Sequence, residues 1–314
     1  MSKNFNVLIV GSGRIGAFID DPKSKNILSH AHGFSQNGFN LVGFVDRDFE
    51  KARKASSIWG GLAFKTIGEA FNKNKIDVVC EAVDDEYHFE VLKELLPYNF
   101  KLVFAEKPLA SSDVQAKKIL DLYKKRGTPI AVNYTRRYIP EFEFLKLRIP
   151  RFGKFVKGTG IYGKGLIHNG SHMIDLLRYL VGEIVDITVY ERIFDYSVKD
   201  PSLSGILKLE SGSNFAICAL DCRLYTIFEM DLLFEKGRIK IDDSKFMIEE
   251  FGIKENSVFS GYKNLTKSEE INTSQDKSML FASKNIYEFL KGNSQLKCTG
   301  EEAYKTLQSC FKFK

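Results

Sequence analysis

The chain has 314 residues, of which 44% are hydrophobic and 27% are charged. At roughly 150 residues per domain this length predicts about two domains, and the composition excludes a disordered chain, a disulfide-stabilised miniprotein and a collagen-like fibre. The formal net charge of +6 is small and spread along the chain, so we expect no nucleic-acid partner.

Two further properties bear on location. No apolar run approaches the roughly 18 residues that span a bilayer. The apolar stretch 7–10 ends at once in a glycine-rich turn, so we expect neither a membrane segment nor a signal peptide. The 5 cysteines form an odd and scattered set, which indicates reduced thiols and a cytoplasmic protein.

Up to about residue 130, short apolar runs rich in β-forming residues alternate with helical stretches. The expected strands cover 5–10, 40–45, 77–83, 101–104 and 129–132. The expected helices cover 49–59, 67–72, 87–96 and 112–125. Strands that alternate with helices are joined by right-handed crossovers, so this half predicts a doubly wound parallel α/β sheet, assigned to residues 1–128.

Beyond about residue 150 the pattern changes. A helix is expected over 171–181, and extended runs follow at 184–190, 205–210, 214–220, 227–234, 238–241 and 246–251. Short turns separate these runs, which predicts a large, open, mostly antiparallel sheet. With two closing helices over 277–291 and 301–311, they make an α+β domain that we assign to residues 129–314.

The first strand leads directly into a glycine-rich turn. Its residues are Gly11, Ser12, Gly13, Arg14, Ile15 and Gly16. Between a buried strand and a helix, the first glycine permits a tight turn, the second lets the backbone approach a pyrophosphate, and the third allows close packing. N–H groups at the helix start then bind the phosphates. The context favours a Rossmann dinucleotide site over a turn that binds nothing.

The second strand ends in Asp46 and Arg47. An acid here accepts hydrogen bonds from the adenosine ribose and repels a 2′-phosphate, which favours NAD over NADP. Arg47 weakens this preference, because a guanidinium suits a 2′-phosphate. Gly16 and Asp46 are 30 positions apart instead of about 20. The excess lies in the polar segment 20–25, which we interpret as a surface insertion, with the edge of the site as the alternative.

After the fourth expected strand comes Glu106-Lys107-Pro108. Together with the glycine-rich turn it resembles the signature of the glucose-fructose oxidoreductase, inositol dehydrogenase and rhizopine-catabolism (Gfo/Idh/MocA) family. Segments 133–140, 170–176 and 299–303 look like three further family segments in the same order. The resemblance implies a Rossmann domain plus an open sheet that pairs subunits into a homodimer or homotetramer. It also implies hydride transfer between a nicotinamide and a carbinol carbon of a sugar, inositol or sugar nucleotide.

The resemblance further implies that Lys107 and His172 are the catalytic pair. Alcohol oxidation needs a base for the hydroxyl proton, and histidine titrates near the operating pH. A lysine ammonium stabilises the developing alkoxide. Lys107 follows an apolar strand at the carboxyl edge of the sheet, where such folds bind ligands. His172 shares a polar helical stripe with His168, Asp175 and Tyr179, which favours a site over a core histidine.

Other residues are assigned to the same site. The expected substrate-binding residues are Tyr134, Arg137, His168, Asn169 and Asp175. The glycine turn, Asp46 and Arg47 are expected to bind the cofactor. Five further residues are assigned to it: Val83, His88, Glu106, Lys107 and Arg136. The two arginines suit a phosphate or carboxylate, or equally a salt bridge between domains. No metal site is expected. His168 and His172 have a spacing that could hold a metal, but the glutamate of an H-E-x-x-H motif is absent, and Cys218 and Cys222 have no partnering cysteine or histidine pair.

Two departures from the family pattern concern the site. His168 stands where many members carry an aspartate, so either the substrate contact differs or the proton relay passes through Asn169 or Asp175. Val83-Asp84-Asp85 replaces Thr-Pro-Asn before His88, which indicates a reshaped loop beside the nicotinamide. Two other functions stay open: a dinucleotide-binding sensor without catalysis, and an NAD-dependent glycosidase of the same fold.

Overall fold

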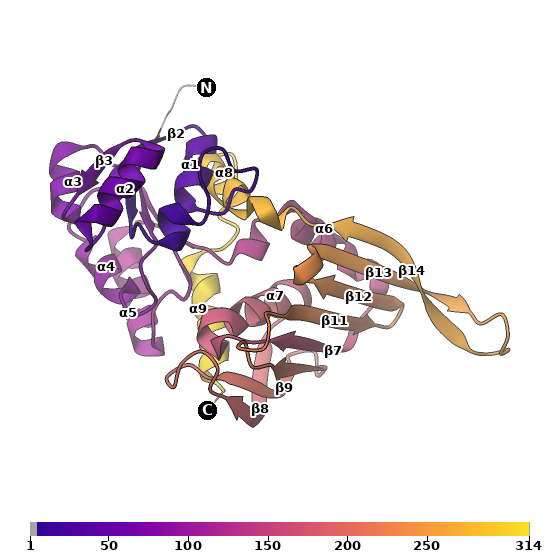
Figure 1. Ribbon diagram of the computed structural model, residues 1–314. Coiled ribbons are helices and arrows are strands. Elements are labelled where there is room, and N and C mark those ends of the chain that lie inside the picture. Colours follow the sequence, from indigo (N-terminus) through magenta and orange to yellow (C-terminus); the bar gives the residue numbers. More distant parts are fainter. Residues whose placement is uncertain (1–4, 314) are drawn as a thin grey trace. The chain divides into compact units, whose positions relative to one another are not determined.

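The computed structural model describes residues 5–313, and the chain divides into two compact units (Figure 1). The first unit comprises the chain up to Ile139 together with Gln275–Lys305. The second comprises Pro140–Ser274 together with residues 306–313. The sequence-based boundary at 128/129 lies 11 positions earlier and does not return a late segment to the first unit.

A parallel sheet of six strands, in the order β3-β2-β1-β4-β5-β6, forms the centre of the first unit. The strands are β1 (Phe5–Val10), β2 (Phe39–Val45), β3 (Leu62–Phe64), β4 (Val78–Glu81), β5 (Leu102–Ala105) and β6 (Ile130–Val132). The strand order reverses between β1 and β4, and ligands of such sheets bind outside the carboxyl ends of the strands at that point. The predicted doubly wound sheet is confirmed, whereas the short edge strand β3 was not expected.

Helices flank this sheet. They are α1 (His30–Gln36), α2 (Phe49–Trp59), α3 (Ile67–Lys73), α4 (His88–Glu94), α5 (Asp113–Arg126) and α8 (Ser278–Leu290). The side chains of Asp48, Thr66 and Ser112 cap α2, α3 and α5 by accepting a backbone N–H of the first turn. Helix α8 packs beside α1 (Figure 1), which explains why this late segment belongs to the first unit.

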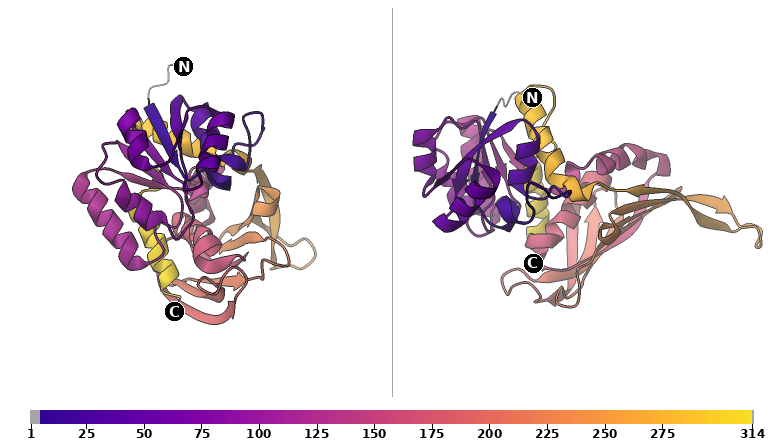
Figure 2. Two further views of the ribbon diagram at one scale, coloured as in Figure 1. Left: turned by 60° about the vertical axis from the view of Figure 1, so that its left-hand side comes forward. Right: turned by 45° about the horizontal axis from the view of Figure 1, so that its top comes forward.

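An eight-stranded sheet, in the order β14-β13-β12-β11-β7-β10-β9-β8, dominates the second unit. Its strands are β7 (Phe155–Tyr162), β8 (Ile184–Ile193), β9 (Ser202–Leu209), β10 (Asn214–Ala219), β11 (Phe228–Phe234), β12 (Gly237–Asp242), β13 (Met247–Glu255) and β14 (Lys263–Asn272). Every pairing is antiparallel except that of β7 with β10. The predicted open, mostly antiparallel sheet is thus confirmed. Figure 2 shows β13 and β14 running on beyond the other strands.

The two faces of this second sheet differ. On the covered face lies α7 (Ser171–Val181), and a Cβ at Gly160 would overlap the sulfur of Met173. Helices α6 (Pro140–Arg148) and α9 (Gly300–Phe311), the latter shared by both units, complete the fold. On the open face, Ile161 and Ile206 are exposed. None of the helices described between residues 5 and 313 has the length and apolar character that a bilayer crossing needs.

Candidate functional site

The three glycines after β1 have different surroundings. Gly11 has a φ of +96°, and a Cβ at this position would overlap the carbonyl of Ala82. A Cβ at Gly16 would overlap the carbonyl of Gly11. A Cβ at Gly13 would meet nothing within 4 Å. The fold therefore requires the first and third glycines, and the backbone at Gly13 borders open space that a pyrophosphate fits.

The end of β2 turns back onto the glycine turn. The Asp46 carboxylate accepts the backbone N–H of Ser12 at 2.7 Å and that of Asp48 at 2.9 Å. The Arg47 guanidinium lies 3.8 Å from the centre of the Tyr87 ring. A cavity of about 540 Å³ is lined by Asp46, Arg47, Asp48 and Tyr87, by Gly11 and Gly13, and by Val83. This cavity, the glycine turn and Asp46 together fit the adenosine half of a dinucleotide.

The loop that follows β4 is tied to its own strand. His88 donates its Nε2 proton to the Val83 carbonyl at 3.0 Å. The other ring nitrogen, Nδ1, lies 3.7 Å from Oε2 of Glu81, and both side chains are buried. Burial raises the pKa of Glu81. Sequence reasoning missed Glu81, a carboxyl group directly beneath the loop that departs from the family pattern.

At the end of β5, Glu106 is buried and Lys107 is half-buried. Oε1 of Glu106 accepts from His30 Nε2 at 2.8 Å and from Asn133 Nδ2 at 2.6 Å, while Oε2 accepts the Lys107 backbone N–H at 3.2 Å. The peptide bond between Lys107 and Pro108 is cis. The carboxyl edge of the sheet thus carries a fully engaged carboxylate with the lysine directly after it.

His30 was not expected at the site, and the segment that precedes it explains its position. Asp20 Oδ2 accepts from the backbone N–H groups of Leu28 and Ser29 and from His32 Nδ1 at 2.6, 3.1 and 3.1 Å. The Asp20 side chain is only 2% exposed. The tip of the segment is exposed, as expected of a surface insertion, but its base is a buried cluster of hydrogen bonds around Asp20. A polar histidine pair in an apolar helix was the available signal.

The segment after β6 is buried in the first unit. Tyr134, Arg136 and Arg137 are each less than a tenth exposed. Arg137 Nη1 lies 3.5 Å from Oε2 of Glu302, in the first turn of α9. This ion pair lies within one unit, so it is not the salt bridge between domains that was one interpretation. A ligand role for the three side chains stays a prediction.

In the second unit, α7 begins from a π-helical turn over Gly165–Gly170. Asp200 holds this turn by accepting the backbone N–H groups of Ile167 at 2.8 Å and His168 at 2.9 Å. The His168 ring stacks on Tyr196 with centroids 4.5 Å apart. The expected polar stripe is thus divided, because His168 lies in the π-helical turn while half-buried His172 lies in the first turn of α7.

Two other residues near α7 have defined partners. Asn169 donates its side-chain amide to the Gly163 carbonyl at 2.8 Å. Asp175 is 2% exposed, and its Oδ1 accepts the Thr306 hydroxyl proton at 2.8 Å. The Arg178 guanidinium also donates to Thr306. Asp175 therefore links α7 to α9 in the second unit, and direct contact with substrate stays a prediction.

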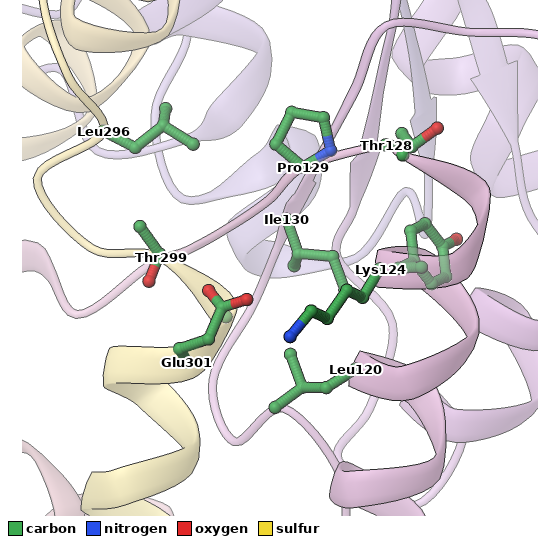
Figure 3. A pocket seen from close by; sticks show the side chains of 11 residues that line it. Leu120, Lys124, Thr128, Pro129, Ile130, Leu296, Thr299 and Glu301 are labelled. Atoms are coloured by element: carbon green, nitrogen blue, oxygen red, sulfur yellow. The ribbon is translucent and has the colours of Figure 1, made fainter.

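A second cavity, of about 310 Å³, lies between α5, the start of β6 and the start of α9 (Figure 3). Leu120, Ile130 and Leu296 give it an apolar lining, with Lys124 and Glu301 at its edge. It lies at the amino end of β6, opposite to the edge at which sheets of this kind bind ligands. We therefore do not assign it to the site. Among residues 5–313, no group of three or more histidine, cysteine or acidic side chains is arranged to hold a metal ion.

Comparison with known proteins bears on these features. Residues 5–134 match the family model described as an oxidoreductase family with an NAD-binding Rossmann fold. This chain thus carries the NAD-binding domain of the Gfo/Idh/MocA family in residues 5–134. It is therefore an oxidoreductase with an NAD-binding unit, and the resemblance stated from the sequence is confirmed.

Individual relatives cover most of the chain. An inositol 2-dehydrogenase of Corynebacterium glutamicum is 26% identical in an alignment of 281 residues, and the match covers 80% of this chain and 80% of the relative. The UDP-N-acetylglucosamine 3-dehydrogenase of Acidithiobacillus ferrooxidans has a TM-score of 0.77 at 14% identity, covering 98% of this chain and 95% of its own. The WlbA dehydrogenase of Bordetella pertussis, solved with NADH and UDP-GlcNAcA, has a TM-score of 0.79 at 17% identity, covering 99% and 95%. Both solved structures share the fold of this chain.

Proposed function

We propose that this oxidoreductase is an NAD-dependent dehydrogenase that oxidises the CH–OH group of a sugar, an inositol or a sugar nucleotide, or reduces the matching carbonyl. The observation that carries the proposal is the carboxyl edge of the first sheet. There an open glycine turn, a fixed Asp46 and the Glu106–Lys107 pair follow strands β1, β2 and β5 of one sheet. The curated relatives named as dehydrogenases favour an enzyme over a sensor without catalysis.

NAD is proposed over NADP because of how Asp46 is held. Two backbone N–H groups fix its carboxylate beside the glycine turn, where it would repel a 2′-phosphate. Arg47, which would attract that phosphate, lies against the Tyr87 ring. Replacing Asp46 with Ser is expected to lower the preference for NADH over NADPH by about tenfold or more. Fluorescence titration with the two reduced cofactors measures the ratio, and an unchanged ratio contradicts the assignment.

Lys107 and His172 are proposed as the catalytic residues. When bound, NAD supplies the hydride acceptor. The Lys107 ammonium stabilises the negative charge that develops on the substrate oxygen, and His172 takes the hydroxyl proton. Both side chains are half-buried, which leaves each accessible to a ligand.

The remaining contacts are proposed by position. Val83, His88, Glu106 and Arg136 are assigned to the nicotinamide side of the cofactor. Tyr134, Arg137, His168, Asn169 and Asp175 are assigned to the substrate. Because His168 and Tyr196 stack, the substrate would meet an aromatic surface at the usual aspartate position, which suits the apolar C–H face of a sugar ring.

The test combines identification with turnover. The purified protein is denatured, and any released dinucleotide and ligand are identified by mass spectrometry. A panel of inositols, sugars and sugar nucleotides is then offered with NAD, and formation of NADH is followed. Sustained NADH formation supports the dehydrogenase. Turnover without net NADH supports the glycosidase, and binding without turnover of any panel member supports the sensor.

A matched pair of lysine variants tests the mechanism. Lys107→Ala is expected to lower kcat by about 10²-fold or more, since the charge on the oxygen loses its stabilising partner. Lys101→Ala serves as the control, because Lys101 lies at the opposite end of the same strand and pairs with Asp77 at the surface. Near-normal turnover of Lys107→Ala contradicts the assignment.

We also propose a cytoplasmic homodimer or homotetramer. The open face of the second sheet combines exposed Ile161 and Ile206 with the ion pair between Arg238 and Asp231. A second copy would cover these apolar side chains. Light scattering after gel filtration measures the mass, and Ile206→Lys is expected to yield monomer. The cytoplasmic assignment is supported by the 5 cysteines, which form an odd and scattered set and not a disulfide framework.

A further inference from the structure

Glu106 is a buried carboxylate of the first unit that three hydrogen-bond donors surround. Its Oε1 receives two hydrogen bonds, from His30 at 2.8 Å and from Asn133 at 2.6 Å. Its Oε2 receives the backbone N–H of Lys107 at 3.2 Å. A carboxylate with three donors has a fixed orientation. Because one of the donors is the backbone N–H of Lys107, the carboxylate also holds the backbone from which the lysine side chain extends.

The electrostatic surroundings of Glu106 make His30 the decisive partner. Burial alone would raise the pKa of Glu106, but the hydrogen bond and attraction of His30, aided by Lys107 and Asn133, hold that pKa below its ordinary value. The neighbouring strand β4 offers no stabilising charge here, since burial and then the Glu106 charge raise the pKa of Cys80, and Glu106 also raises the pKa of buried Glu81. An ionised Glu106 therefore depends on donors from outside its own strand.

The imidazole of His30 is oriented toward this one contact. The side chain is 0% exposed, and its ring edge packs against Phe104 with centroids 5.1 Å apart. Because a carboxylate only accepts, Nε2 carries the proton that bridges to Glu106. Nδ1 is buried without a hydrogen-bond partner. The hydrogen bond at Nε2 therefore sets the orientation of the ring.

The scaffold around His30 fixes where the ring lies. Ser29 caps α1 by accepting the His32 N–H at 3.1 Å, and Asp20 holds the backbone of Leu28 and Ser29. On the other side of the helix, a Cβ at Gly33 would overlap the Met279 carbonyl, so α1 lies tightly against α8. The insertion after the glycine turn is thus built to deliver one imidazole to the end of β5.

We infer that His30 is a positioning residue that acts through Glu106: it keeps this carboxylate ionised and oriented, and Glu106 in turn positions Lys107. The inference rests on the proposed function of Lys107 for its consequence in catalysis. The contact between His30 and Glu106 can be tested without any substrate. The two claims therefore fail in different experiments.

The first experiment titrates Glu106 itself. The carboxyl stretching band of the full-length protein, labelled with ¹³C-glutamate, is followed by infrared spectroscopy against pH, and the Glu106→Gln difference spectrum identifies the band. In His30→Ala the midpoint is expected to rise by about one pH unit or more, because the group that opposed burial is gone. His30→Gln keeps an N–H donor and is expected to lie between the two. His32→Gln, a buried neighbour that contacts Asp20, is the control and keeps the wild-type midpoint.

The second experiment is a double-mutant cycle in kcat on the substrate found by the panel. His30→Ala and Glu106→Gln are each expected to lower kcat by about tenfold with little change in KM. The double variant is expected to match Glu106→Gln alone, since His30 acts only through that carboxylate. The inference is overturned if the loss of kcat in the double variant equals the product of the two single losses. It is also overturned if folded His30→Ala keeps the wild-type midpoint of Glu106. If no panel member is oxidised, the proposed function fails while the infrared midpoint still decides the role of His30.

Discussion

The two units of this chain hold the side chains that we propose for function by different means. In the first unit, Asp46, Glu106 and Lys107 come directly after parallel strands, and the sheet itself sets their direction. In the second, His168 and His172 belong to a π-helical turn and the helix that follows it, and Asp200, 32 positions away, holds the turn. A site at strand ends is thus fixed by the core, whereas one at a helix entrance depends on a remote loop.

The largest expected effect lies in the second unit. His172→Ala is expected to lower kcat by about 10²- to 10⁴-fold, because the substrate proton loses its acceptor. Steady-state kinetics on the identified substrate measure the loss. Tyr179→Phe is the matched control, since it alters the half-buried residue two turns further along α7 and keeps the aromatic ring against Lys146. Equal activity of His172→Ala and wild type would leave the second unit without a catalytic role.

The next effect concerns the glycine turn of the first unit. Gly16→Ala is expected to lower the free energy of unfolding by about 3 kcal/mol, because its Cβ would overlap the Gly11 carbonyl and backbone cannot yield as a side chain does. Chemical denaturation measures it. Gly13→Ala, whose Cβ meets nothing within 4 Å, should keep wild-type stability and lose affinity for NADH. Similar destabilisation of both variants would show that the turn is not shaped around a ligand.

A smaller loss is expected where a remote loop holds the helix entrance. Asp200→Ala removes the acceptor of two backbone N–H groups and is expected to cost about 2 kcal/mol of stability. Asp200→Asn keeps one acceptor oxygen and should cost about half as much. Chemical denaturation of the three proteins gives the order. An Asp200→Ala variant as stable as wild type would mean that the turn is held by the rest of the second unit.

The smallest effect is one of pH at Asp195 in the same loop. Burial alone would raise the pKa of this carboxyl, but the N–H groups of Lys164 and Cys222 and the Ser202 hydroxyl lower it from 3.8 to about 2. A depressed native pKa adds stability above the unfolded value, and that stability is lost as the pH falls toward about 2. Asp195→Asn should therefore have a lower melting temperature than wild type at neutral pH, and the difference in melting temperature should become smaller between pH 4 and pH 2. A difference in melting temperature that stays constant over this pH range would contradict the assignment to Asp195.

Much of the fold follows from local pattern. The strand Phe5–Val10 and the helices Phe49–Trp59 and Ser171–Val181 have the bounds that the sequence predicts. Strand β7 was missed because two glycines, Gly158 and Gly160, weaken its signal, although both are required where Phe215 and Met173 pack on the backbone. Strand β14 was missed because most of its residues are polar and exposed, and it pairs with β13 alone.

The candidate site shows the same limit more sharply. The glycine turn, Asp46 and Lys107 can be read from the sequence because each stands at a fixed place relative to a strand. His30 could not be assigned, because its partner Glu106 is 76 positions away and no periodic pattern links them. Asp200 escaped notice for the same reason. Side chains that act on site residues from another segment require the tertiary structure.

The return of Gln275–Lys305 to the first unit has a consequence for how the chain is made. The first unit is discontinuous, so during synthesis its sheet emerges long before the helix α8 that packs beside α1. The second unit is nearly complete before α8 leaves the ribosome. A chain truncated before residue 275 therefore lacks α8, against which α1 with His30 packs, and the dinucleotide-binding half reaches its final form only after residues 275–305 have been synthesised.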